Sequence, residues 1–550
     1  IIIGHTAQNV EKRSNMQLLA KDAPLERSLT KMKKIIDDLG YKIRLSKEKN
    51  PVKNSFSVNL SFEGANNYIF SNGKGSLSQS SLASAYGEFI ERLQTNLYFN
   101  DYYLENRTFF PDQKAFDKNS DFLDEDIKKY YTLEGIEKDD FLDFNSSNFS
   151  QIISLPFINQ TSQKKVYFPI NLLANLYASN GLSTGNTKDE AKVQALCEIF
   201  ERNVKIKVIK DGLALPEFPK EVLNKFSKIS EDIKSLEEKG FKIKVYDSSL
   251  GGIYPVTAIA FINPKNNTLF LSFGSHPILE VSIERTLTEL LQGREIDELD
   301  SFEKPTFDME EIASNSNLES HFVDSNAKVG LQFLSAKKSF IYTPWKFDIE
   351  KSSEQFIILK EILNKENKTI YLREYDYLGF YSCHMIVPDF SEIYPLEDMI
   401  YNNKNQGKLI RDFILNKDKY DLENLLDELN GFDDSINMGA FIGVIFKEDF
   451  SLGEFKADIL IKLKEYEEAI FCLEQSNKKF NYILAQVLRM TQENLNLEDF
   501  KDALFDIFEE ENIKRALDII DEKSSLINLE FANEYKNILN LFDSKNKKYI

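Results

Sequence analysis

Two stretches of the sequence repeat a glycine followed, thirteen residues later, by the pattern Glu-x-x-Glu-Arg. The charged residues of the two copies are Glu88, Glu91 and Arg92, and Glu198, Glu201 and Arg202. Glutamates three residues apart lie on one face of a helix, so two such helices facing each other would bring four carboxylates to one place. Carboxylates repel one another in a shared site unless cations compensate their charge. The pattern therefore predicts a divalent metal site, and hard oxygen ligands favour Mg²⁺.

The second copy has the periodicity of an amphipathic helix with one acidic face. At about 100° per residue, Glu190, Glu198 and Glu201 fall within an arc of roughly 80°. Leu196 and Phe200 occupy the opposite side. The alternative is an ordinary solvated helix face rich in glutamate. Such a helix would carry more lysine at the i+4 positions, and the repeated glycine offset also argues against it.

A third predicted helix lies within SIERTLTELLQGRE, residues 282–295. Glu289 and Gln292 lie on the side away from its leucines, and Arg285 stands beside them. Arginines next to a carboxylate cluster suit a polyanionic ligand, because phosphate oxygens bind both divalent ions and guanidinium groups. The three helices together indicate a site for a metal–nucleotide complex.

Four sequence blocks resemble the YcaO family, and in particular its stand-alone proteobacterial branch. They are KDAPLERSL (21–29), FSNGKGSLSQSSLASAYGEFIERLQTN (70–96), GLSTGNTKDEAKVQALCEIFERNVK (181–205) and ERTLTELLQGR (284–294). The resemblance extends over residues 16–405. It implies an α/β fold unrelated to the kinase and P-loop folds, which binds ATP and Mg²⁺ through the glutamates of these helices. Better-studied members use ATP to activate a backbone amide of a peptide.

Carried over residue by residue, the resemblance implies two sets of site residues. The nucleotide-binding set is Lys21, Ser28, Ser183, Asn186, Arg202, Glu289 and Gln292, and the metal-binding set is Glu88, Glu91, Glu190, Glu198 and Glu201. Lys21 and Arg202 would neutralise phosphate charge, whereas the serines and Asn186 would donate hydrogen bonds to phosphate or sugar. The segment NGKG (72–75) lacks the spacing GxxxxGK[ST] of a phosphate-binding loop and is a weak signal by itself.

The C-terminal sequence departs from part of the family. Members that form azoline rings end in a proline-rich tail, whereas this sequence ends in LFDSKNKKYI. The stand-alone branch instead resembles an accessory factor for β-methylthiolation of a small-subunit ribosomal protein by the radical enzyme RimO. Alternatives are an azoline- or thioamide-forming enzyme, a metal phosphohydrolase without ATP, and a scaffold built on helical repeats. A simple phosphohydrolase would not need the distant triphosphate contacts implied for Lys21, Ser28 and Asn186.

Composition excludes several classes of partner. The net charge of −20 and the pI near 4.9 oppose direct binding to nucleic acid, but they favour basic partners such as ribosomal proteins. No run approaches the roughly 20 apolar residues that cross a bilayer, so we expect no membrane insertion. The three cysteines, Cys197, Cys383 and Cys472, are too far apart for a disulfide framework. This usage fits a cytoplasmic protein.

The sequence predicts three regions. Residues 1–15 precede the resemblance and are read as an upstream extension or an artificial remnant, 16–407 as the YcaO-type ATP-binding domain, and 408–550 as a helical domain resembling tetratricopeptide repeats. The fold class is therefore α/β, an α+β core with internal duplication, followed by an all-α region. We expect the C-terminal helices to form a homodimer, and we expect residues 100–170 to be an insertion flanking the core.

Pattern also predicts individual elements of the core. A helix is expected over residues 25–39, ended by Gly40, and strands are expected at 56–62, 242–249, 255–262 and 268–274.

Overall fold

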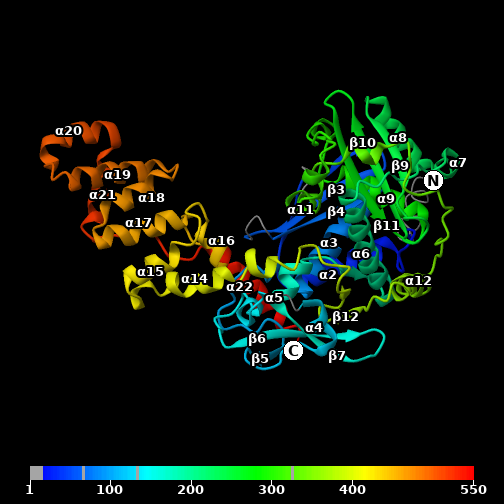
Figure 1. The fold of residues 1–550 in the computed structure, drawn as a ribbon, viewed down its shortest axis with the longest axis horizontal. Helices are drawn as coiled ribbons and strands as arrows, with labels where there is room; N and C mark the ends of the chain where they lie inside the picture. Colours follow the sequence, from blue (N-terminus) through cyan, green and yellow to red (C-terminus); the bar gives the residue numbers. More distant parts are fainter. Residues whose placement is uncertain (1–16, 65–68, 132–134, 324–326, 550) are drawn as a thin grey trace, which may run out of the picture.

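The computed structural model describes residues 17–64, 69–131, 135–323 and 327–549, so the predicted extension at 1–15 lies outside the described residues. Figure 1 shows a larger lobe that contains the strands, and an arm of helices that extends from it. Pairings between the named strands are antiparallel. The predicted class, an α+β core with a helical C-terminal region, is confirmed.

The first sheet is formed by β1 (Ile43–Leu45), β2 (Lys49–Val52), β3 (Ser55–Phe62) and β4 (Phe70–Gly75). The chain enters it from α2 (Leu25–Asp38) and leaves it into α3 (Ser78–Gln94). The helix predicted at 25–39 and the strand predicted at 56–62 are thus confirmed. Leu60, Phe62 and Phe89 are almost fully buried between sheet and helix, which places the apolar face of α3 against the sheet.

The second sheet repeats this arrangement later in the chain. It contains β9 (Lys242–Asp247), β10 (Val256–Asn263) and β11 (Thr268–Ser275) in the order β11-β10-β9. It is preceded by α8 (Ser227–Glu238) and followed by α9 (Leu279–Leu291). The predicted strands are confirmed, and the order of helix, antiparallel strands and helix matches that around the first sheet. The architecture around α3 is therefore repeated around α9, whereas the second copy of the Glu-x-x-Glu-Arg motif, at 198–202, lies on another helix.

The third sheet has the order β5-β6-β12-β13-β8, and β7 pairs with β6. Its strands are β5 (Lys114–Asp117), β6 (Gln151–Asn159), β7 (Lys165–Pro169), β8 (Leu182–Gly185), β12 (Tyr371–Tyr375) and β13 (Tyr381–Ile386). The expectation that residues 100–170 merely flank the core is wrong, because β6 pairs with β12 and buries Phe157, and β7 buries Phe168. Phe157 and Phe168 are therefore part of the hydrophobic core and do not belong to an insertion outside it.

The long helix α6 (Lys188–Lys210) lies between the second and third sheets. Its residues Leu196 and Phe200 are completely buried, in one cluster with Leu271 of β11 and Met385 of β13. The shorter helices of the lobe are α4 (Glu125–Tyr131), α5 (Ile170–Leu172), α7 (Lys220–Leu223), α10 (Met309–Ala313), α11 (Asn315–Val323), α12 (Ser352–Lys365) and α13 (Asp398–Tyr401).

The arm consists of successive helices, and a helical C-terminal region was predicted. They are α14 (Gln406–Leu415), α15 (Leu422–Leu429), α16 (Met438–Ile442), α17 (Leu452–Leu463), α18 (Tyr466–Glu474), α19 (Lys479–Gln492), α20 (Leu497–Phe508) and α21 (Glu510–Ile520). Within the described ranges, no helix is both long enough and apolar enough to cross a bilayer. The resemblance of α17–α19 to tetratricopeptide repeats remains a prediction.

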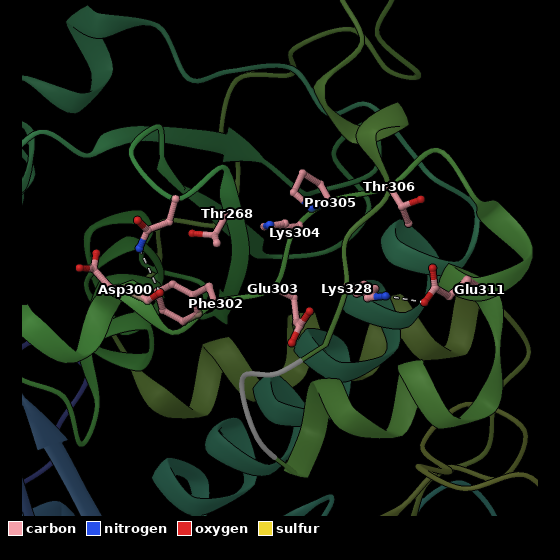
Figure 2. A pocket seen from close by; sticks show the side chains of 10 residues that line it. Thr268, Asp300, Phe302, Glu303, Lys304, Pro305, Thr306, Glu311 and Lys328 are labelled. Atoms are coloured by element: carbon pink, nitrogen blue, oxygen red, sulfur yellow. Dashed lines mark hydrogen bonds and ion pairs between the residues drawn. The ribbon is translucent and has the colours of Figure 1, made fainter.

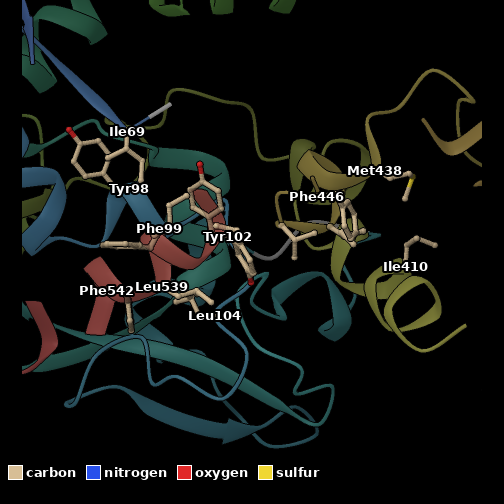
Figure 3. Packing of buried hydrophobic residues seen from close by; sticks show 14 of the residues in the cluster. Ile69, Tyr98, Phe99, Tyr102, Leu104, Ile410, Met438, Phe446, Leu539 and Phe542 are labelled. Atoms are coloured by element: carbon tan, nitrogen blue, oxygen red, sulfur yellow. The ribbon is translucent and has the colours of Figure 1, made fainter. Parts of the chain in front are cut away.

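The last helix, α22 (Asn533–Asn546), returns from the arm to the larger lobe (Figure 1). Phe542 packs edge-on against Phe99 with ring centroids 5.0 Å apart, and Figure 3 shows both rings in one buried group with Leu104 and Leu539. Arg107 donates two hydrogen bonds to Asp543, of 2.8 and 2.9 Å. α22 therefore completes the core of the larger lobe, and the boundary at residue 408 remains a prediction.

Candidate nucleotide and metal site

Three strand-to-helix connections share the pattern Ser-x-Gly at or near the end of the strand. The serine hydroxyls donate to carbonyls of the following helix, from Ser71 to Ala85 at 2.8 Å, from Ser183 to Ala191 at 2.7 Å and from Ser272 to Thr286 at 2.8 Å. A Cβ added at Gly73, Gly185 or Gly274 would lie within 2.6 Å of a backbone atom of its helix or of the helix's N-cap turn. Only glycine fits at this distance, so α3, α6 and α9 are held close to β4, β8 and β11.

The first and third of these units carry their polar residues at the same spacing. Glu88 and Glu91 follow Ser71 by 17 and 20 residues, and Glu289 and Gln292 follow Ser272 by 17 and 20 residues. The Glu-x-x-Glu pair thus recurs on α9 as Glu-x-x-Gln. This shared spacing is a signal in the sequence that supports the third block as part of the same site.

The structure brings the carboxylates of α3 and α6 into one group, which we call the central charged cluster: Lys74, Glu88, Glu91, Arg92, Glu198, Glu201 and Arg202. Arg92 forms an ion pair with Glu88 one turn earlier, and Arg202 forms the equivalent pair with Glu198 at 2.8 Å. The two helices act on each other electrostatically, because Glu198 raises the pKa of Glu91 and Glu88 raises the pKa of Glu198.

Burial and mutual repulsion disfavour the charged form of these carboxylates. Burial raises the pKa of Glu91 well above its usual range, and Glu198 and Glu88 add to the shift against the opposing Arg92 and Arg202. Burial likewise raises the pKa of Glu198 and of Glu201. Cations supplied to this cluster would relieve the repulsion.

Cations of the chain itself already lie among these carboxylates, and sequence reasoning missed two of them. Lys74 of β4 forms an ion pair with Glu289 of α9. Burial lowers the pKa of Lys205 to about 8, against the attraction of Glu201. Arg285 donates to Gln194 of α6 at 2.5 Å. Lys74 stands in the segment NGKG, which the motif comparison set aside because its spacing is not that of a P-loop.

The residues implied near the start of the domain form a second group, at the N-terminus of α6. Glu190 is only 4% exposed and accepts hydrogen bonds from Lys21 at 3.2 Å, from the backbone N–H of Asp22 at 2.9 Å and from Asn186 at 3.0 Å. Ser28 donates to Asn186 at 2.6 Å. Although burial acts in the opposite direction, Lys21 and these donors lower the pKa of Glu190. Glu190 is therefore a paired, ionised carboxylate at one end of the helix.

Ser183 and Gln292, which the family resemblance implies for nucleotide binding, belong to neither of these two groups. Ser183 is fully buried, and its hydroxyl donates to Ala191 as Ser71 and Ser272 do in their own units, so its contacts in this structure hold α6 against β8. Gln292 ends α9, where its backbone N–H donates to Glu289 at 3.3 Å. The assignment of individual site residues remains a prediction.

The donor set suits ATP with Mg²⁺, although among the described residues no three His, Cys, Asp or Glu side chains are placed so that they could hold a metal ion by themselves. Carboxylates lie beside guanidinium groups in this cluster, and this combination suits a complex of magnesium with phosphate. In addition, Nε of Arg92 is buried and lacks a hydrogen-bond partner among the described atoms. The cluster thus has an unused donor as well as excess negative charge.

A separate pocket of about 610 Å³ lies at the end of the second sheet that is opposite Arg285. Figure 2 shows Thr268, Phe302, Glu303 and Lys328 around it. Thr268 begins β11, whereas Arg285 donates to the carbonyl of Ser275 at the end of that strand, at 3.2 Å. None of the predicted site residues lines this pocket.

The chain is similar to known proteins over most of its length. The family profile described as YcaO cyclodehydratase, ATP- and Mg²⁺-binding, matches residues 72–391. The "Ribosomal protein S12 methylthiotransferase accessory factor YcaO" of Escherichia coli strain K12 is 38% identical over 480 residues, which cover 82% of each chain. An uncharacterised protein of Haemophilus influenzae is 38% identical over 479 residues, covering 82% of this chain and 81% of its own.

A solved "Heterocyclase in complex with substrate and Cofactor" is also similar, at 16% identity and a TM-score of 0.49, over 70% of this chain and 57% of that one. The predicted cofactors, ATP and Mg²⁺, are those that the family description names. The profile match and the identity over most of the sequence show that this chain belongs to the YcaO family.

Proposed function

We propose that the chain is an ATP- and Mg²⁺-dependent enzyme that hydrolyses ATP to activate an amide of a peptide or protein. The convergence of two Glu-x-x-Glu-Arg helices in the central charged cluster supports this proposal most directly. The description of the family as cyclodehydratase supports amide activation as the reaction class.

The two groups of residues would hold different parts of the bound complex. Glu88, Glu91, Glu198 and Glu201 would hold the metal ions, joined by Glu190, while Arg202, Lys21, Ser28, Ser183 and Asn186 would bind the nucleotide, with Glu289 and Gln292 beside them. When bound, ATP supplies the leaving group that makes an amide oxygen replaceable. The chain's own contribution is to position the phosphates and to neutralise their charge without bulk water.

The protein substrate proposed for this activity is a basic small-subunit ribosomal protein, with RimO as the partner enzyme. One relative is named an accessory factor of the ribosomal protein S12 methylthiotransferase. The net charge of −20 favours association with a basic protein, and both partners imply a cytoplasmic location.

The arm is proposed to form a homodimer. Phe500 and Ile507 on α20 are 43% and 67% exposed, and Phe471 on α18 is 63% exposed. No residue of α20 is fully buried, although its sequence is strongly amphipathic. Exposed aromatic and aliphatic side chains concentrated on an arm are typical of an association surface.

Incubation of the purified protein with ATP and excess Mg²⁺, followed by chromatography of the nucleotides, tests the central proposal. The expected result is Mg²⁺-dependent formation of AMP with pyrophosphate or of ADP with phosphate, and the product pair identifies the bond that is cleaved. Purified RimO and ribosomal protein S12 should be included in parallel reactions, because an accessory enzyme can require its substrate. Absence of Mg²⁺-dependent products in both reactions would reject the proposed activity.

A further inference from the structure

Lys74 occupies a position in the central charged cluster that no assigned role explains. It lies on β4 between two glycines, and a Cβ added at Gly73 would lie 1.9 Å from the carbonyl oxygen of Ser81 on α3. The backbone around Lys74 is therefore fixed against α3. The N–H of Asn72, two residues earlier, donates to Glu88 at 3.2 Å, so this part of β4 runs directly beside the first carboxylate pair.

The Lys74 ammonium group interacts with carboxylates of three different helices. It forms an ion pair with Glu289 of α9. Burial lowers the pKa of Lys74, whereas Glu201 of α6 and Glu88 of α3 raise it. The Lys74 side chain is still 30% exposed to solvent. A ligand that enters the cluster can therefore reach the ammonium group, while the backbone of Lys74 stays in place.

A lysine in this position competes with metal ions for the same oxygen atoms. When Mg²⁺ neutralises the glutamates, the electrostatic attraction between them and the Lys74 ammonium group becomes weaker. The nearest new anions would be the phosphates that arrive with the metal. A flexible four-carbon side chain on a fixed backbone suits such an exchange of partners.

We propose that Lys74 is a phosphate-binding residue, which neutralises the carboxylates in the nucleotide-free protein and exchanges Glu289 for the phosphate chain when ATP and Mg²⁺ bind. This inference rests on the proposed function, because it assigns a further ligand in the same site. It also gives the segment NGKG a role that its spacing alone does not indicate.

Calorimetric titration of Lys74→Met with a non-hydrolysable ATP analogue and Mg²⁺ tests the exchange, and AMP serves as a second ligand. Loss of a charged hydrogen-bond donor should weaken binding of the triphosphate analogue about 10- to 100-fold. Binding of AMP should change by less than about 3-fold, because the effect is confined to the phosphate chain.

Lys192→Met is a matched control, since Lys192 lies on α6, is 15% exposed and pairs with Glu374 at 3.4 Å. It should bind both ligands as the parent does. Lys74→Arg, which keeps the charge, should recover part of the affinity. Lys74→Gln provides a second uncharged variant if the methionine variant does not fold.

Equal affinity of the parent and of the uncharged variants for the analogue would overturn the role of Lys74. An equal loss for analogue and AMP would also overturn it, because that result indicates a structural defect. If the parent itself binds no analogue in the presence of Mg²⁺, the proposed function fails and the inference fails with it.

Discussion

Each carboxylate pair in the central charged cluster is accompanied by a cation from the chain. Arg92 and Arg202 pair with the first glutamate of their own motif, and Lys74 bridges to α9. The four glutamates carry a negative charge that the sequence pattern alone leaves uncompensated, and this imbalance is the basis for predicting Mg²⁺. In the structure, Arg92, Arg202 and Lys74 compensate part of the negative charge of the glutamates. Added Mg²⁺ must therefore compete with these side chains for the carboxylates.

Replacement of Glu201 by glutamine separates catalytic from structural roles at the residue scale. Because burial raises its pKa, the ionised form of Glu201 is disfavoured in the folded protein above the unfolded pKa of a glutamate. Glu201→Gln should therefore keep or raise the melting temperature without Mg²⁺, while ATP hydrolysis falls by about 100-fold or more.

Hydrolysis rates with excess Mg²⁺ and melting curves in a chelator provide the two measurements for Glu201→Gln. Equal hydrolysis rates in the variant and the parent would remove Glu201 from the site. A lower melting temperature in the chelator would instead assign it to a structural ion pair.

At the scale of elements, periodicity predicted those parts of the fold that depend on local pattern. Residues 25–39 were predictable because their apolar residues follow the helical period, and β10 and β11 because they are short apolar runs rich in β-branched and aromatic residues. The strand order of the third sheet was not predictable, because β6 and β12 are far apart in sequence and their pairing depends on tertiary packing.

The candidate site shows the same division. The glutamates of α3 and α6 could be predicted from their repeated spacing. The presence of Lys74 and Lys205 in the site could not be predicted, since a single lysine in a strand or a helix forms no recognisable sequence pattern. Only the packing of β4 and α6 around the cluster places these two ammonium groups among the carboxylates.

The Ser-x-Gly connections predict a large cost for a single methyl group. In Gly73→Ala the new Cβ would meet the carbonyl oxygen of Ser81 at 1.9 Å, so β4 and α3 must separate. We expect the free energy of unfolding to fall by about 1–3 kcal/mol or more. Gly431→Ala is the control, because a Cβ there meets no atom of the described structure within 4 Å. Urea unfolding compares the two, and equal midpoints would show that the strand–helix contact is loose.

A buried histidine in β13 predicts sensitivity to acid. Burial and the nearby Arg373 lower the pKa of His384 to about 3, from 6.5. The unfolded chain therefore binds a proton that the folded protein excludes between about pH 6.5 and pH 3, and stability is lost as the pH falls through this window.

His384→Gln should reduce the loss of unfolding free energy between pH 6.5 and 4.5, by at most about 1.4 kcal/mol per pH unit. Urea unfolding at the two pH values measures the difference. An identical pH dependence in variant and parent would contradict the role of His384.

At the scale of the whole molecule, the arm is anchored to the larger lobe at both of its ends. Deleting residues 408–550 would remove α22 and expose Phe99, so it cannot isolate the contribution of the arm. Point variants on α20 avoid this problem, because this helix lies far along the arm (Figure 1) and its residues Phe500 and Ile507 are exposed.

Phe500→Asp combined with Ile507→Asp should convert a homodimer to a monomer, because each subunit would place carboxylates in an apolar contact. Binding of the ATP analogue should stay unchanged. Light scattering gives the mass, and Asp502→Asn on the same helix is the control. A monomeric parent, or a double variant of unchanged mass, would exclude this face from self-association.

The return of α22 also bears on synthesis of the protein. Phe99 meets Phe542, and Lys545 is fully buried with its ammonium group 5.6 Å from the ring centroid of Phe99. The ribosome makes the two sides of this contact at nearly opposite ends of the described chain. The segment around Phe99, which follows α3, must therefore wait with its apolar surface uncovered until the arm has been translated. A chain that stalls within the arm leaves this surface open, which makes it a target for chaperones and proteases.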